Sequence, residues 1–462
     1  MVFDLRGNTF KYIMLLFFLV VVLLGQAWVS AEEAPEQDSE REILIPWDEE
    51  AVWGFPSLHL VSELHPFEVE REFWHPGLAT VPGEFENVEI QIRGRGNSTW
   101  VNAIGAGIEK LPLRMRFYEE RSVFNSEHAH RNWILMANAF DFALLRNYFV
   151  HYLAELMGNT GFVPAIQNFH LYLNGEYMGV YQLADERDIG PGRLDLLIDP
   201  DPTISEYMIQ MGERSRPHRP VDSRFTAHRF RYGIAFPDRR ARTMGHDNYA
   251  AAFIRRISGE LRRSALDWET ISSLIDVESF VEFYLIQELT RNTDVATSSI
   301  FMQIRGQYGD RRLHMGPVWD FDVSLGVIPR GSDRGGLVNT PEGLFAVNRH
   351  YWFRHLMNIP EFRDKVVIRF NEMVATEIPL VIDEIRRIST TYVDDFNRNF
   401  DRHAINSFRC LGRYCHNATF LEHVDYMIGF VHDRIAYLEG IFNSPDIEYL
   451  IPERNEPFIS WR

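Results

Sequence analysis

Cysteine is almost absent from this sequence, which contains only Cys410 and Cys415 among its 462 residues. No matching Cys or His pair lies at zinc spacing from them, and His416 alone does not supply one. In an exported protein, two thiols this close along the chain can form a small local disulfide. We therefore favour a disulfide over a metal-ligand role.

The sequence also lacks an excess of basic residues. It contains 65 Asp and Glu residues against 47 Lys and Arg residues, a formal net charge of -18. An anionic surface of this kind repels phosphate backbones, which argues against nucleic acid as a partner. A local cluster of Lys, Arg and metal can still bind ATP, and the acidic excess is compatible with a basic macromolecular substrate.

Long hydrophobic runs are missing except near the N-terminus. Two basic residues precede an apolar run from about Tyr12 to Leu24, and a stretch of small residues ends at Ala31. This order is typical of a signal peptide over residues 1–31, since a membrane anchor usually needs about 20 apolar residues. The alternative is an uncleaved anchor that continues to Val29. We expect a secreted, cell-surface or periplasmic protein, in contact with a membrane only if this segment is retained.

Several catalytic signatures are absent. The sequence has no Gly-Lys-Ser/Thr after a Gly-rich loop, no HExxH, no Gly-x-Ser-x-Gly and no EF-hand loop. These absences argue against P-loop, zinc-protease, nucleophile-elbow and calcium-loop chemistry. His170 and His314 lie on strand-like patterns, and we interpret them as packed or solvent-facing side chains.

What the sequence contains is an ordered change from strand-like to helix-like patterning. Apolar and polar residues alternate over residues 88–93, 113–117, 168–173 and 179–183, which is typical of strands. The pair Asn174-Gly175 between the last two ranges indicates a hairpin turn. Helical patterns cover residues 141–157, 248–265, 277–290 and much of 360–441. An α+β fold is therefore expected. Its parts would be an acidic linker (32–50), a sheet-rich lobe (51–200), a mostly helical lobe (201–445) and a tail (446–462).

Three aspartates carry the strongest chemical signal. Asp294 ends the expected helix that covers residues 277–290, and a hairpin from Ile300 to Val318 would bring it close to Asp320 and Asp322. If the latter two lie on a strand, they share one face. Phosphoryl transfer needs such a set, because hard oxygen ligands hold Mg²⁺ on the phosphates while one carboxylate orients or deprotonates the attacking hydroxyl.

A structural interpretation of these aspartates stays open. An Asp at a helix end or in a turn is usually a cap or a surface residue, and Asp294 taken alone favours that interpretation. Asp320 and Asp322 flank Phe321 and follow Trp319. Carboxylates seldom lie among core aromatics unless they are paired or bound to metal, so for this pair both roles remain open.

A Gly-rich stretch, Arg93-Gly-Arg-Gly-Asn-Ser-Thr-Trp100, lies between two expected strands. Backbone N–H groups of such a turn can approach phosphates, and a nearby cation can neutralise them. The candidate phosphate-binding residues are Arg95, Asn97, Lys110 and Arg114. A hairpin with solvated arginines is the alternative.

Taken together, the ordered motifs resemble the CotH kinase family, atypical kinases first met in spore coats. The motifs run over roughly residues 90 to 325, with a looser helical match to about residue 440. The segments that carry the resemblance are Arg95-Gly-Asn-Ser-Thr-Trp100, Lys110-x-Pro-Leu-Arg114, Trp133-x-Leu-x-Ala-Asn138, Asp141 through Asn147, Leu173-Asn-Gly-Glu-Tyr-x-Gly-Val-Tyr181, Glu288-Leu-Thr-Arg-Asn-x-Asp294 and Gly316-Pro-Val-Trp-Asp-Phe-Asp322.

The resemblance implies a protein-kinase-like two-lobed fold that binds ATP and Mg²⁺ or Mn²⁺. The implied reaction is phosphorylation of Ser or Thr in a protein substrate. From the acidic charge balance, we expect this substrate to be basic or rich in Ser and Thr. Lys110 would contact phosphates from the sheet lobe, and Asp294 would take the place of the catalytic-loop aspartate. Asp320, together with Asp322, would hold the metal. The strand end from Leu183 to Asp185 would form the hinge beside the adenine.

One position departs from the family pattern. Many members have Asn as a second metal ligand where this chain has Ser299, and a hydroxyl is a poorer Mg²⁺ ligand. A weakly active or inactive surface or coat scaffold with the same fold is therefore one alternative function. Transfer of AMP instead of phosphate, with ATP bound in the flipped sense, is another.

Overall fold

The computed structural model describes residues 54–63, 71, 73–96, 100, 110–212, 224–228, 230–295, 298–307, 309–327, 340–403 and 418–456. All of the described residues belong to one compact unit, within Trp47–Arg462. The expected signal peptide, the acidic linker, Asn97 and both cysteines lie outside the described residues.

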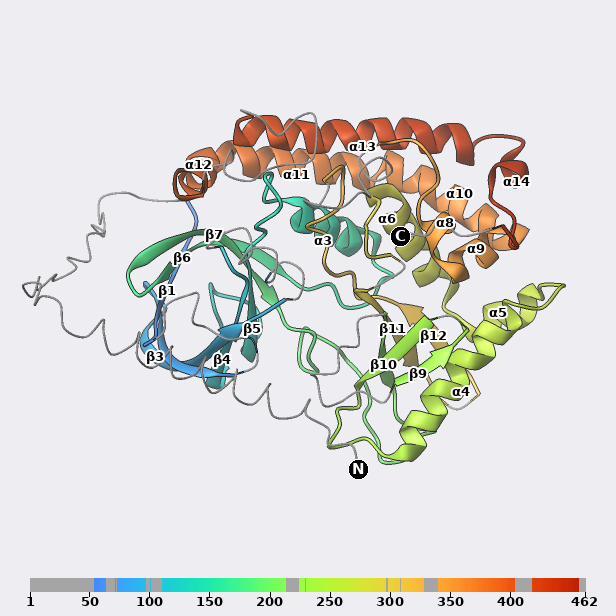
Figure 1. The fold of residues 1–462 in the computed structure, drawn as a ribbon, viewed down its shortest axis with the longest axis horizontal. Coiled ribbons are helices and arrows are strands. Elements are labelled where there is room, and N and C mark those ends of the chain that lie inside the picture. The colour runs from blue at the N-terminus through green and yellow to red at the C-terminus, as the bar shows by residue number, and fades with distance from the viewer. Residues whose placement is uncertain are drawn as a thin grey trace, which may run out of the picture. The chain divides into compact units, whose positions relative to one another are not determined.

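The first seven strands form a closed barrel (Figure 1). Their order around the barrel is β1-β2-β3-β4-β5-β7-β6, and the ring closes through parallel pairing of β1 with β6. The strands are β1 (Ser57–Val61), β2 (His75–Val81), β3 (Phe85–Gly94), β4 (Leu113–Arg121), β5 (His130–Met136), β6 (Ile166–Leu173) and β7 (Glu176–Asp185).

Alternating residues build the barrel core, as the sequence pattern predicts. In β3, Ile90 and Ile92 are buried inside the barrel, whereas Glu89 between Val88 and Ile90 is exposed. The hairpin signal is also confirmed, because Asn174 (φ 52°) and Gly175 (φ 81°) join β6 to β7. Positive φ at both positions is what a tight two-residue hairpin turn requires.

A second sheet lies within the part of the chain that was expected to be mostly helical. It is 5-stranded, with the order β12-β11-β8-β10-β9. Its strands are β8 (Tyr207–Met211), β9 (Arg224–Ala227), β10 (Phe230–Phe236), β11 (Ile300–Arg305) and β12 (Arg312–Met315). The expected hairpin between Ile300 and Val318 is confirmed by the antiparallel pairing of β11 with β12.

Helix α3 lies between β5 and β6 in the chain, and the other helices follow the barrel. The helices are α3 (Arg146–Met157), α4 (Met244–Glu260), α5 (Trp268–Leu274), α6 (Val277–Thr290), α8 (Ala346–Arg349), α9 (Tyr351–Met357), α10 (Pro360–Ala375), α11 (Glu377–Thr391), α12 (Val393–Arg402), α13 (Phe420–Phe442) and α14 (Ile447–Leu450). No helix within the described ranges is both long and apolar enough to cross a membrane.

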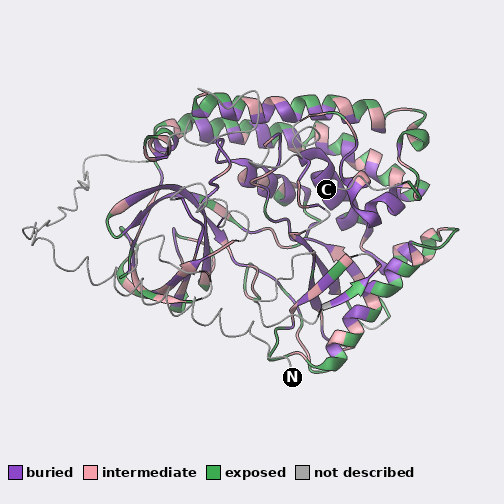
Figure 2. Cartoon of the chain, viewed as in Figure 1, coloured by how far each residue is buried: buried purple, intermediate pink, exposed green. Residues whose placement is uncertain are grey.

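Helix α6 forms the centre of the helical part and coincides with the expected helix over residues 277–290. The Asp276 carboxylate caps its start by accepting a hydrogen bond from the Ser279 N–H at 2.9 Å. The helix is buried along nearly its whole length (Figure 2). It packs against α3, α10, α13 and β12, so the residues that follow it are fixed from several sides.

The α+β class is confirmed, with a sheet-rich part and a helical part. The closed barrel in the first part does not confirm the two-lobed protein-kinase architecture that the resemblance implies. The barrel and the helical part meet at α12, which packs against β7.

Candidate functional site

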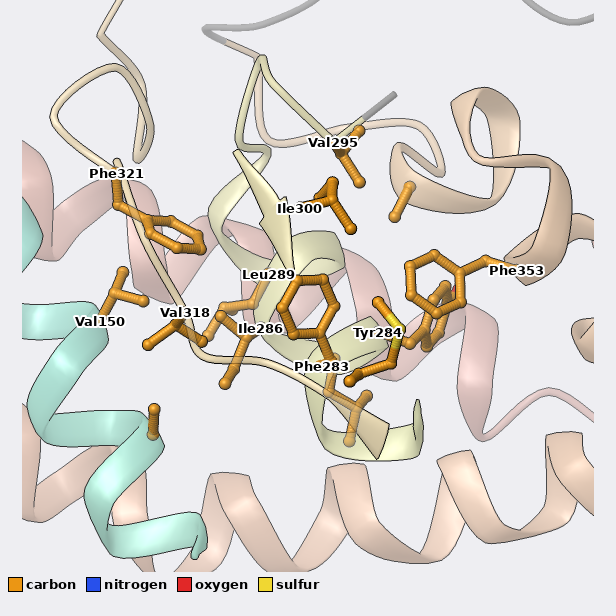
Figure 3. Close-up of a cluster of buried hydrophobic side chains, with 14 of the residues drawn as sticks. Val150, Phe283, Tyr284, Ile286, Leu289, Val295, Ile300, Val318, Phe321 and Phe353 are labelled. Carbon is orange, nitrogen blue, oxygen red and sulfur yellow. The ribbon is translucent and has the colours of Figure 1, made fainter. Parts of the chain in front are cut away.

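The turn after α6 positions Asp294. Arg291 takes a left-handed conformation (φ 51°) and ends the helix. Asp294 therefore lies in the following turn, whereas the sequence analysis placed it at the end of the helix. Asn292 shapes this turn, because its Oδ1 accepts a hydrogen bond from the Asp294 N–H at 3.0 Å. Val295 and Ile300 point into the apolar cluster of Figure 3 and anchor the turn on both sides.

The loop after β12 positions the second acidic segment. It begins at Gly316 (φ 108°), where a Cβ atom would lie 1.9 Å from the carbonyl oxygen of Thr160, so only glycine fits. Asp320 has a φ of 70° and belongs to no strand. The expectation that Asp320 and Asp322 share a strand face is therefore wrong.

Phe321 determines how this loop turns. Its ring enters the same apolar cluster as Val318 (Figure 3), and its N–H donates a hydrogen bond to Asn147 Oδ1 at 2.8 Å. Burying an aromatic side chain is strongly favourable, so the ring fixes the loop on the core. Asp320 remains exposed and Asp322 half-buried on either side of it.

Ser299 joins the two acidic segments. Its Oγ lies 3.1 Å from Asp294 Oδ2 and 3.0 Å from Asp320 Oδ2. A serine hydroxyl has one proton, so a single hydrogen-bond donor is shared between two negative charges. The structure thus brings Asp294, Ser299 and Asp320 together, although they come from separate parts of the sequence.

Asp322 adds a third carboxylate to this group. No hydrogen bond or ion pair holds its carboxylate within the described part of the chain. Burial, followed by the charges of Asp320, Asp141 and Asp294, raises the pKa of Asp322 well above its ordinary value, and Arg95 opposes this effect. Like charges gathered in a desolvated site disfavour ionisation, and a bound cation would restore it.

The acidic group fits a hard divalent cation. Mg²⁺ is usually bound through one or two carboxylates, while water and phosphate oxygens complete its coordination. Among the described residues, no three His, Cys, Asp or Glu side chains are arranged to hold a metal ion by themselves. The side chains of Asp320, Asp322 and Ser299 present oxygen atoms, which are the ligand type that Mg²⁺ binds.

Asp141 is the fourth acidic residue near this site, and its charge acts on Asp322. Helix α3 begins at Arg146, and the Asp141 carboxylate accepts hydrogen bonds from the N–H groups of Ala143 at 3.0 Å and Arg146 at 2.9 Å. It also forms a buried ion pair with the Arg146 guanidinium. Arg146 in turn donates to the Ser324 carbonyl at 3.0 Å, which fixes the loop carrying Asp322 to α3.

Lys110 is buried, with 2% of its surface exposed. Its Nζ has no hydrogen-bond partner among the described residues and lies 5.5 Å from the centre of the Tyr181 ring. Burial lowers the pKa of Lys110 to about 7, against the opposing effect of Asp141. A buried ammonium without an acceptor is costly, so this side chain suits an anionic ligand.

Arg95 and Arg114 lie on the barrel side of the acidic group. The Arg95 guanidinium is stacked 5.0 Å from the centre of the Trp319 ring, directly before Asp320 in the chain. Arg114 forms an ion pair with Glu186, the residue that follows β7. Arg95 is therefore near Asp320 and Asp322, and Arg114 is near Arg95, whereas Asn97 lies outside the described residues.

The two expected hinge residues have other contacts. Leu183 is buried in the barrel core. Asp185 forms an ion pair with Arg193 at 2.9 Å, and its Oδ2 accepts a hydrogen bond from the Ala165 N–H at 3.2 Å. Neither residue is joined to the three aspartates by a hydrogen bond.

Sequence analysis missed three contributors to the site. Asn147 positions the acidic loop, and Glu186 and Arg187 lie beside the barrel arginines. Asn147 does belong to one of the ordered motifs, so a signal existed for it. Glu186 and Arg187 belong to no motif, and only folding places them near Trp319.

Comparison with known proteins gave one family match. The family model described as CotH kinase protein matches residues 90–438, which is most of the chain. A search of curated proteins found no match.

Proposed function

The chain belongs to the CotH kinase family, and from this membership we propose that it transfers the terminal phosphoryl group of ATP to a Ser or Thr hydroxyl of a protein substrate. The observation that carries the proposal is the shared Ser299 hydroxyl between the carboxylates of Asp294 and Asp320. Phosphoryl transfer depends on positioning and charge stabilisation more than on covalent chemistry by the protein.

The roles of the acidic residues follow from their surroundings. Asp320 and Asp322, with Ser299, would hold Mg²⁺ or Mn²⁺, and the metal would supply positive charge to the phosphate oxygens. Asp294 is half-buried in a turn that is anchored on both sides. Its carboxylate would accept the hydrogen of the substrate hydroxyl and so orient the attacking oxygen.

The basic residues would bind the phosphates of ATP from the barrel side. Lys110 has a buried amine that lacks an acceptor within the described residues, and a phosphate would favour its charged form. Arg95 and Arg114, with Asn97, would add further donors. In the two-lobed arrangement that we propose, the barrel takes the part of the sheet lobe, and Leu183 to Asp185 form the hinge beside the adenine.

The substrate and location are part of the same proposal. A basic or Ser/Thr-rich protein suits the net charge of -18, and nucleic acid does not. The N-terminal segment supports export, with membrane attachment only if the segment is retained. The mass of the mature protein recovered outside the cytoplasm tests this, because removal of residues 1–31 should leave Glu32 as the first residue.

Nucleotide binding and phosphate transfer test the proposed chemistry. With Mg²⁺, ATP should raise the melting temperature of the purified protein, and label from the γ-phosphate should appear on a basic protein substrate. Asp320→Asn should lower transfer about 100-fold or more, because it removes a charge from the metal site. Asp383→Asn, an exposed position on α11, is the matched control and should leave transfer unchanged.

The outcomes separate the alternatives. Intact mass of the modified substrate distinguishes a gain of phosphate from a gain of AMP. If neither Mg²⁺ nor Mn²⁺ supports ATP binding by the wild-type protein, the enzymatic proposal is wrong and a scaffold with the same fold is the better description.

A further inference from the structure

Arg187 is held between two aromatic rings beside the candidate site. Its guanidinium carbon lies 4.0 Å from the centre of the Phe301 ring and 4.2 Å from the centre of the Trp319 ring. Phe301 is on β11, and Trp319 directly precedes Asp320. Rings on the guanidinium restrict its orientation, so its hydrogen-bonding edge is fixed before any ligand binds.

Two of the three side-chain nitrogens of Arg187 make no hydrogen bond to the described part of the chain. Its Nε and Nη1 atoms are buried and have no hydrogen-bond partner within the described ranges. Buried charged donors without acceptors destabilise a fold, and a buried arginine with a purely structural role usually has hydrogen-bond acceptors in the protein. An arginine with packed faces and unused donors is therefore suited to an external anion.

The surrounding charges are predominantly positive. Arg95 shares the Trp319 ring with Arg187, and Arg114 lies close to both. Glu186 is the nearest acid, and it is already paired with Arg114. Burial, opposed by Glu186, and then the nearby charges of Arg95 and Arg114 lower the pKa of Arg187 to about 9, while Asp320 opposes this.

This arginine pair lies next to the acidic group. Asp320 acts electrostatically on both Arg95 and Arg187, and the same tryptophan that carries their guanidinium groups leads into Asp320. If Asp320 binds a metal, its charge is engaged there, and the two guanidinium groups are left for an anion bound to that metal.

We propose that Arg187, together with Arg95, binds a phosphate group of the nucleotide through the edge of its guanidinium. The inference rests on the proposed function, and it assigns to Arg187 the positioning of the phosphates next to the metal site. Planar guanidinium groups match phosphate oxygens in two-point contact, which lysine cannot reproduce.

The competing interpretation is that Arg187 only fastens the end of β7 to the second sheet. Loss of the side chain would then lower the stability of the fold and would reduce the binding affinity for all ligands by the same factor. A phosphate contact instead predicts selectivity for ligands that contain phosphate, so binding of several ligands distinguishes the two.

The experiment compares wild-type protein with Arg187→Met and Arg187→Lys by calorimetric titration. The probes are inorganic tripolyphosphate, ATP and adenosine, the first two with and without Mg²⁺. Arg187→Met should weaken tripolyphosphate and ATP about tenfold or more and leave adenosine unchanged. Arg187→Lys should keep the fold and the charge but recover only part of the affinity. Arg255→Met is the control, since Arg255 is stacked on Phe225 away from this cluster.

The outcomes for this inference differ from those for the proposed function. Equal ATP and tripolyphosphate affinities in wild type and both variants overturn the role of Arg187 alone. Tripolyphosphate binding that depends on Arg187, without any phosphate transfer, supports the inference while the proposed function fails. Absence of phosphate and nucleotide binding by the wild type overturns both.

Discussion

At the scale of single residues, Lys110 ties stability to pH. Its amine is buried and its pKa is lowered to about 7 from the ordinary 10.5. Below pH 7 both folded and unfolded chains carry the charge, and the folded state bears the full cost of burying it. Between about pH 7 and 10.5 the unfolded state binds more protons, so stability rises with pH.

We expect Lys110→Met to be more stable than the wild type near pH 6.5 and to lose this advantage as the pH approaches 10. The difference should reach the order of a few kcal/mol, because each pKa unit corresponds to about 1.4 kcal/mol. Urea unfolding at several pH values measures it. Lys365→Met, at an exposed position on α10, should show no such trend. A stability difference between Lys110→Met and the wild type that does not change with pH would contradict the lowered pKa of Lys110.

Residue-scale expectations from the sequence succeeded where the chain itself brings groups together. The spacing of the hairpin correctly placed Asp294 near Asp320, because β11 and β12 return the chain to its start. The strand assignment for Asp320 and Asp322 failed, since burial of Phe321 outweighs strand pairing there. Arg187 could not be found, because its contacts with Phe301 and Trp319 depend on how β7 meets the second sheet.

At the scale of elements, Glu288 holds three helices together. It is fully buried on α6 and forms an ion pair with Arg434 of α13 at 2.6 Å. Its carboxylate also accepts hydrogen bonds from the N–H groups of Ala346 at 2.9 Å and Val347 at 3.3 Å, at the start of α8. A family motif therefore begins with a structural glutamate and ends with a candidate catalytic aspartate.

Glu288→Gln should lower the free energy of unfolding by about 3–5 kcal/mol, because it leaves the buried Arg434 without a counter-charge. Chemical denaturation measures this loss. Glu278→Gln is the matched control in the first turn of the same helix, where the exposed pair with Lys365 should contribute less than about 1 kcal/mol. Similar losses of unfolding free energy in the two variants would show that the Glu288–Arg434 ion pair does not stabilise the packing of these helices.

Helices were easier to predict than the sheets. The helix over residues 277–290 was located correctly because its apolar run is long and Asp276 caps it. The second sheet was missed as a unit, since its strands are short and β8 pairs with β11 across a large separation in the sequence. The pattern of apolar and polar residues within each strand does not indicate that β8 pairs with β11.

At the scale of the whole described molecule, α12 connects the barrel with the helical part. Asp395 on this helix accepts a hydrogen bond from the Phe55 N–H at 2.9 Å and contacts His170 Nε2 of β6 at 2.8 Å. Asn399 Oδ1 accepts a hydrogen bond from the Val180 N–H of β7 at 3.0 Å. These contacts hold the barrel against the helical part of the molecule.

Asp395→Ala should loosen this connection and speed hydrogen exchange in β6, β7 and α12 together. The loss of its contacts with the Gly54 N–H, the Phe55 N–H and His170 corresponds to about 2–4 kcal/mol of local stability. Hydrogen–deuterium exchange followed by mass spectrometry measures it, with β11 and β12 as internal references. Asp394→Ala, at the exposed neighbouring position, should leave exchange unchanged. Uniform acceleration over the whole chain would point to global destabilisation instead.

The closed ring of strands has a consequence for encounters with other polypeptides. Because β1 returns to β6, every strand of the ring has a neighbour on both sides. Unpaired strand borders are what template sheet-to-sheet aggregation. Among the described sheets, only the outer strands β9 and β12 of the second sheet have such a border. Joining of a foreign strand to these sheets would therefore take place there, on the part of the chain that does not carry Lys110 and Arg95.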